Sequence, residues 1–150
     1  MVVVVLCAAV AGLLVRDHLA HDGGKAIAWR DVTAQLPGAT FDRAVARRFE
    51  TRAELQQYLA RAMPGRAPHT PALLHAHEEL LLVAPGPRSS TGYGVAIEAV
   101  LDQDDRILVR VREQTPTLGT PVAARVTYPY RLLVLPSSRK PVLVDWQGRP

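Results

Sequence analysis

The spacing of apolar residues changes part-way along the chain, and the first clear pattern is helical. Between Thr51 and Met63, the leucines Leu55 and Leu59 stand four residues apart and fall on one face of a helix. Thr51 can cap this helix, because Glu54 follows it at the spacing of a capping box. A Pro-Gly pair comes directly after Met63 and stops the helix. The pattern therefore predicts one helix, from Thr51 to Met63.

From Glu78 onward the apolar residues alternate with polar ones or form short runs, as is typical of β-strands. Ile107, Val109 and Val111 alternate along one such strand, so one of its faces should be buried. The predicted strands are Ala26 to Val32, residues 43–50, Leu80 to Ala84, Tyr93 to Ala99, Ile107 to Val111, Val122 to Tyr128, Leu132 to Leu135 and an edge strand from Pro141 to Trp146. The fold class expected is mainly β: an antiparallel sandwich or partly open barrel with one N-terminal helix.

The first fifteen residues differ in composition from the rest. Val2 to Val15 contains no charge and no proline, and as a helix it would span roughly 21 Å, short of a bilayer core near 30 Å. We expect residues 1–15 to be a signal peptide or weak membrane anchor, although such a run also suits a buried strand or helix. A polar linker at 16–25 and a single β-rich domain at 26–146 would follow. The protein should then be extracytoplasmic: secreted, periplasmic, or anchored by residues 2–15.

Charge and composition exclude several classes of partner. The net charge of +4 is spread along the chain, with no basic run or tail, so nucleic acid is not an expected partner. Aromatic residues make up only 5 %, too few for a base-stacking platform. The only cysteine, Cys7, lies in the apolar leader, so neither an internal disulfide nor a cysteine-based zinc site can form. Contact with a membrane is expected only through the N-terminal apolar segment.

Searches for catalytic and cofactor chemistry find no convincing pattern. His75 and His77 are spaced so that two imidazoles would share a strand face, but no third histidine lies close, so an exposed loop pair is the better interpretation. No nucleophile elbow surrounds Ser89 or Ser90, and no lysine follows the glycines as it would in a phosphate loop. We therefore expect no catalytic residue, no metal, no cofactor and no enzymatic activity.

Two short tyrosine-bearing loops are the distinctive part of the sequence. The candidate partner-binding residues are Ser89, Ser90, Thr91, Gly92 and Tyr93 in the first loop, and Tyr128, Pro129 and Tyr130 in the second. Turn chemistry alone also explains the first loop, if its glycines adopt positive φ angles and Tyr93 starts the next strand. The functional interpretation is a pair of loops held by a rigid sheet and offered to a protein partner.

These loops and strands resemble the C-terminal domain of PrcB-type protease-complex subunits over about residues 45–136. The elements that carry the resemblance are Leu80 to Val83, Thr91-Gly92-Tyr93-Gly94, Val95 to Val100, Ile107 to Glu113 with Pro116, and Tyr128-Pro129-Tyr130. The upstream helix from Thr51 to Met63 also has a counterpart in that family. The resemblance implies a PrcB-like domain within residues 26–146 and a non-catalytic accessory protein that associates with and supports an extracytoplasmic protease complex.

A second, weaker resemblance leads to an alternative function. Ser89-Ser90-Thr91-Gly92-Tyr93 is similar to part of a loop motif in the chagasin-type inhibitors of cysteine proteases. The Asn-Pro start of that motif is absent. Inhibition of a cysteine protease is therefore the alternative to a supporting role, and in both cases the partner is a secreted or envelope protease.

Overall fold

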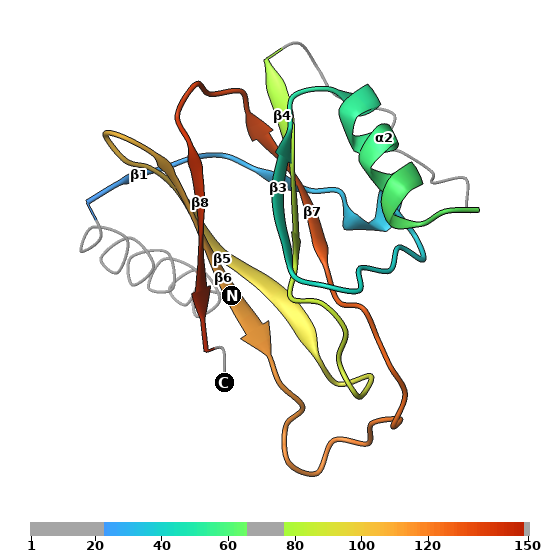
Figure 1. Cartoon of the computed structure of the whole chain (residues 1–150). Coiled ribbons are helices and arrows are strands. Elements are labelled where there is room, and N and C mark those ends of the chain that lie inside the picture. Colours follow the sequence, from blue (N-terminus) through green and yellow to red (C-terminus); the bar gives the residue numbers. More distant parts are fainter. Residues whose placement is uncertain (1–22, 66–76, 149–150) are drawn as a thin grey trace, which may run out of the picture.

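The computed structural model describes residues 23–65 and 77–148, and their elements are labelled in Figure 1. The elements in chain order are β1 (Lys25–Ala26), β2 (Arg30–Asp31), the 3-10 turn η1 (Thr33–Gln35), β3 (Val45–Phe49), α2 (Arg52–Ala62), β4 (Glu78–Ala84), β5 (Gly94–Asp102), β6 (Ile107–Gln114), β7 (Arg131–Pro136) and β8 (Val142–Gln147). The predicted helix and most predicted strands are thus confirmed within a few residues at their ends.

The strands form two sheets of four. The first has the order β1-β5-β6-β8 and the second the order β2-β7-β4-β3. Neighbouring strands are antiparallel except β6 and β8, which run parallel with Val109 opposite Val144. The expectation of a purely antiparallel arrangement was therefore wrong at β8. The reason is that the chain leaves the first sheet after β6, adds β7 to the second, and returns to β6 in the same direction.

The two sheets pack face to face, and the helix covers the second sheet from outside. One apolar cluster contains buried side chains from both sheets, among them Val109 and Val111 from β6 and Leu81 and Leu133 from β4 and β7. A separate cluster joins the helix to the other face of the second sheet and includes Leu55, Leu59, Phe49, Leu80, Leu82 and Leu132. β4 is buried on both faces, which explains why its sequence is a continuous apolar run and not an alternation.

The helix begins and ends where its sequence predicts. The Thr51 hydroxyl accepts a hydrogen bond from the Glu54 backbone N–H at 3.2 Å, and the Glu54 carboxylate accepts one from the Glu50 N–H at 2.9 Å. These contacts satisfy two donors that the first helical turn would otherwise leave unpaired. The helix is not N-terminal, however, because β1, β2 and β3 precede it. That part of the predicted fold class is not confirmed.

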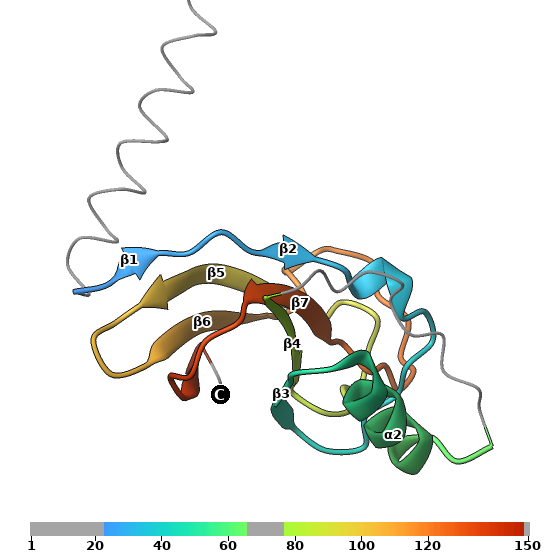
Figure 2. The ribbon, with the colours of Figure 1, turned by 90° about the horizontal axis from the view of Figure 1, so that it is seen from above.

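The segment from β1 to β2 links the two sheets. β1 pairs with β5 in the first sheet, and β2 pairs with β7 in the second, as Figure 2 shows from above. The single strand predicted from Ala26 to Val32 is therefore divided into two short strands. Trp29 lies between them and packs, partly buried, against the core between the sheets.

The largest error of the sequence prediction concerns the connection between β6 and β7. The strand predicted from Val122 to Tyr128 is absent, and residues 115–130 form a long loop with a single bridge at Thr127. Neither sheet closes into a barrel. In the described residues no helix is long and apolar enough to cross a bilayer. The expected leader at 1–15 and most of the expected linker at 16–25 lie outside the described residues.

Candidate protein-interaction site

Two loops lie together at one end of the sandwich, the lower end in Figure 1. They are residues 85–93, between β4 and β5, and residues 115–130, between β6 and β7; we call them the loop platform. Arg88 and Thr127 exchange two backbone hydrogen bonds of 2.8 Å. The Thr91 N–H donates to the Ala123 carbonyl at 3.1 Å, and the Thr127 hydroxyl donates to the Ser90 carbonyl at 2.7 Å. The backbone itself therefore holds the two loops in one arrangement.

A buried ion pair fixes the platform to the sheet. Arg88 donates through Nε and Nη2 to both carboxylate oxygens of Glu113 on β6. The Glu113 side chain is only 1 % exposed, whereas that of Arg88 is 21 % exposed. Arg88 Nη1 also donates to the carbonyls of Pro85 and Pro87. The hydrogen bonds to Glu113 raise the pKa of Arg88, so this guanidinium remains charged. One side chain thus orders the first loop and ties it to β6.

The glycines of the first loop permit a close approach of the second. A Cβ atom on Gly92 would stand 2.6 Å from Val122 Cγ1 and 2.7 Å from Pro116 Cγ, closer than real contacts allow. Neither Gly92 nor Gly94 has a positive φ angle, so the expectation of left-handed glycines was wrong for this motif. Gly86, at the start of the loop, does have a positive φ of 90°. Gly92 is therefore required for packing between the loops.

The outer part of the platform carries exposed apolar side chains that the sequence analysis did not single out. Leu118 is fully exposed, Val126 is 60 % exposed and Val122 is 41 % exposed. The sequence around them contains Pro116, Gly119 and Pro121, and this composition is typical of a loop. The strand was predicted because apolar residues alternate from Val122 to Tyr128. Exposed leucine and valine side chains gathered on one loop are characteristic of interaction surfaces.

The predicted partner-binding residues lie close together, but they are not equally accessible. Ser89 and Thr91 are exposed, Gly92, Tyr93, Tyr128 and Pro129 are half-buried, and Ser90 is only 9 % exposed. Tyr130 turns inward: its ring packs against Phe41 at 5.4 Å between centroids, and its hydroxyl donates to the Leu36 carbonyl. Burial raises the pKa of this phenol. Tyr130 thus anchors the end of the second loop to the core. A role of the eight candidate residues in binding stays a prediction.

The candidate metal ligands of the sequence can be located only in part. Among the described residues, no three histidine, cysteine, aspartate or glutamate side chains come together. His77 is described, but its predicted companion His75 lies outside the described residues. The platform presents apolar tips, exposed serine and threonine residues, and partly accessible tyrosines, which are groups suited to binding.

A comparison with protein families identifies this part of the chain. The family model for the PrcB C-terminal domain matches residues 80–136. This segment is similar to the PrcB C-terminal domain. The match runs from β4 to the end of β7 and contains both loops of the platform. The match is shorter than the predicted extent of 45–136. It leaves out β3 and α2, which come before residue 80 in the chain. Comparisons with curated proteins and with solved structures returned no match.

Proposed function

We propose that the protein is an exported, non-catalytic accessory subunit that binds and supports an extracytoplasmic protease complex through the loop platform. The observation that carries this proposal is the PrcB-type segment, 80–136, together with the exposed apolar side chains that its longer loop presents. PrcB-type subunits are accessory proteins of such complexes, and a binding surface without catalytic groups suits that role.

The length of the second loop supports a role in recognition. Loops longer than about 12–15 residues without secondary structure are uncommon in small domains and are usually functional. Residues 115–130, between β6 and β7, exceed that length. The loop is nevertheless ordered by the hydrogen bonds of Arg88, Thr91 and Thr127. Such preorganisation lowers the entropy cost of binding a partner.

The test compares capture of a protease complex by platform and control variants. Tagged protein is expressed in its native host and recovered with its partners, which are identified by mass spectrometry. We expect the wild type to retain a protease component and the variant Leu118→Ser/Val126→Ser to lose it. Leu143→Ser is the matched control, because Leu143 is also exposed, at 46 %, but lies on the edge strand β8. Equal recovery by the platform variant would exclude the platform as the binding surface.

Two further measurements test the supporting role and the export. Added to the purified protease, the protein should prolong its activity; slower cleavage would favour the cysteine-protease inhibitor, as would inhibition of papain at micromolar concentration. For export, residues 1–25 are fused to alkaline phosphatase, which needs disulfides and so becomes active only outside the cytoplasm. An inactive but fully expressed fusion would contradict the proposed location.

A further inference from the structure

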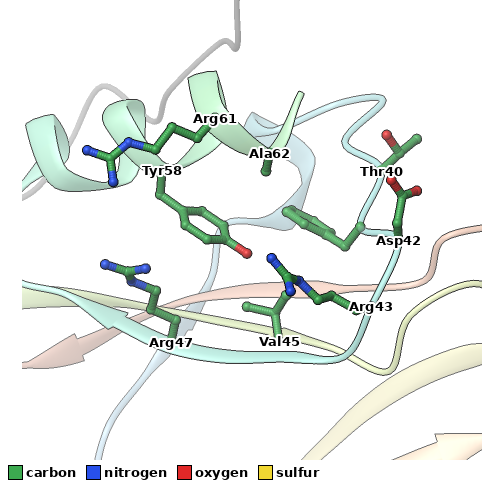
Figure 3. A pocket seen from close by; sticks show the side chains of 9 residues that line it. Thr40, Asp42, Arg43, Val45, Arg47, Tyr58, Arg61 and Ala62 are labelled. Atoms are coloured by element: carbon green, nitrogen blue, oxygen red, sulfur yellow. The ribbon is translucent and has the colours of Figure 1, made fainter. Parts of the chain in front are cut away.

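A second site lies outside the PrcB-type segment, in a cleft between β3 and α2. The cleft has a volume of about 350 Å³ and is open to solvent along the helix. Figure 3 shows its lining, in which three arginines surround one tyrosine: Arg43 and Arg47 from the strand side, with Arg61 and Tyr58 from the helix. A cleft in which three arginines face one carboxylate requires an explanation that core packing does not supply.

One arginine of β3 lies on the face where apolar residues are expected. Residues 45, 47 and 49 alternate along β3 and therefore point to the same side, towards α2, while Arg43 lies in the bend before the strand and also lines the cleft. Phe49 is buried at the far end of this row, and Val45 is half-buried between the two arginines. Arg47 thus occupies the part of the face that the helix leaves open.

Aromatic rings hold one of these guanidinium groups in place. The Arg47 guanidinium carbon lies 5.1 Å from the centre of the Tyr58 ring and 5.4 Å from that of Phe49. This cation–π contact uses the flat face of the guanidinium and leaves the N–H donors along its edge. Desolvation raises the pKa of Tyr58, despite the opposing effect of Arg47 and Arg43, so its hydroxyl remains a neutral donor. The cleft is therefore a set of hydrogen-bond donors with fixed positions.

The charge of the cleft is not balanced within the described part of the chain. There, Arg43, Arg47 and Arg61 form no ion pair, and the carboxylate of Asp42 stands at the rim beside Thr40. Seven other described arginines differ, since they form ion pairs: Arg30, Arg48, Arg88, Arg106, Arg110, Arg112 and Arg131. Like charges in one cleft repel each other, and an incoming anion would remove that cost.

We propose that this cleft binds acidic side chains on an extended segment of the protein partner, and so forms a second contact of the complex. The inference rests on the proposed function. β3 is the edge strand of its sheet, so an extended chain can lie beside it. Arg47 on this edge strand and Arg43 in the bend before it both line the cleft, so carboxylates along one extended peptide can meet both guanidinium groups. Guanidinium groups bind carboxylates through paired hydrogen bonds.

The binding test uses synthetic peptides and the full chain. The probe is a capped nonapeptide in which glutamate and threonine alternate, and the matched control peptide has glutamine in place of glutamate. Binding is followed by isothermal titration and by NMR shifts of residues in β3 and α2. We expect the glutamate peptide to bind at least ten times more tightly than the glutamine peptide, and its affinity to fall as salt increases. Equal binding of the two peptides would overturn the proposal.

Charge-removing variants locate the site. Arg43→Gln/Arg61→Gln should weaken binding of the glutamate peptide at least tenfold, and it leaves the aromatic packing of Arg47 in place. Lys25→Gln/Arg139→Gln is the matched control, because it also removes two positive charges, from exposed positions outside the cleft lining, and should leave binding unchanged. Thermal unfolding of each variant checks that the fold persists. Unchanged binding by the double variant would exclude the cleft.

Small anions and the platform variant separate the remaining outcomes. If inorganic phosphate or free glutamate binds as tightly as the peptide, the cleft is a small-anion site and the proposal is wrong. The platform variant Leu118→Ser/Val126→Ser should bind the acidic peptide normally. Failure of peptide binding alongside capture of a protease would refute only this inference. Peptide binding without any captured protease would refute the proposed function and its partner, while the acidic-ligand site would stand.

Discussion

Replacing Arg88 by alanine should destabilise the protein more than neutralising its partner, Glu113, by glutamine. The reason is the difference in burial within the ion pair. The carboxylate of Glu113 is 1 % exposed and has little access to water once the guanidinium is removed, whereas the Arg88 side chain is 21 % exposed. Arg88 also keeps carbonyl partners at Pro85 and Pro87 when the carboxylate is neutralised.

The magnitudes follow from these contacts. Breaking a buried ion pair by removing one partner costs about 3–5 kcal/mol, since a charge is left in the interior. Because Arg88 is partly exposed and part of its attraction is screened, we expect Arg88→Ala to cost about 3 kcal/mol, at the lower end of that range. Glu113→Gln keeps a hydrogen-bond acceptor near Arg88. The charge that remains is that of the Arg88 guanidinium, which water reaches more easily than it reaches Glu113. A loss of about 1–2 kcal/mol is expected for it.

Urea unfolding followed by circular dichroism measures both effects. With a slope of about 1.5 kcal/mol per molar urea, Arg88→Ala should lower the midpoint by about 2 M and Glu113→Gln by about 1 M. The loops should also loosen, so amide exchange at Thr91 and Thr127 should accelerate in Arg88→Ala. The reasoning is refuted if Glu113→Gln costs as much as Arg88→Ala, or if both lower stability by less than about 1 kcal/mol.

Three other changes test the packing around the platform and the sheet. Gly92→Ala places a methyl group 2.6 Å from Val122 Cγ1 and should lower the free energy of unfolding in urea by about 1–3 kcal/mol. The same variant should also lose capture of the partner. Tyr130→Phe removes the hydrogen bond to the Leu36 carbonyl but keeps the ring contact, so thermal unfolding should show a loss of about 1 kcal/mol. Burial raises the pKa of Glu79 above its ordinary 4.5, so the folded protein holds this proton more tightly than the unfolded chain, and stability falls as the pH rises through the raised pKa. Glu79→Gln should therefore flatten stability curves measured between pH 4 and 8. At neutral pH the variant loses the 3.8 Å ion pair with Arg48 but also removes a buried carboxylate oxygen that has no hydrogen bond, so its net cost there should be no more than about 1 kcal/mol.

The elements that the sequence predicts well are those whose local pattern and tertiary surroundings agree. The helix has a capping threonine, a leucine face and a Pro-Gly stop, and the structure uses all three. β6 alternates because one of its faces packs on the second sheet. The parallel pairing of β8 was not predictable in this way, since strand direction depends on where the chain returns after β7. No residue between Pro136 and Val142 encodes that choice locally.

The candidate site was predicted in part for a similar reason. The residues of the first loop were found because glycine, serine and tyrosine form a recognisable turn motif. The sequence analysis missed the exposed apolar residues Leu118, Val122 and Val126. A period-two pattern, such as that from Val122 to Tyr128, occurs both in strands and in extended loops, so the pattern alone does not distinguish them. In the structure this loop packs against Gly92 of the first loop, where Val122 and Pro116 occupy the space that a side chain would fill.

The energetics of the platform favour recognition over stability as the reason for its construction. A buried ion pair such as Arg88–Glu113 contributes little net stability compared with apolar residues of the same volume, but it fixes one geometry of the loop. Leu118 and Val126 gain almost nothing from the hydrophobic effect while they face water. An ordered loop that keeps apolar side chains exposed therefore lowers its free energy chiefly when another surface covers it. That is the behaviour expected of a subunit in a complex.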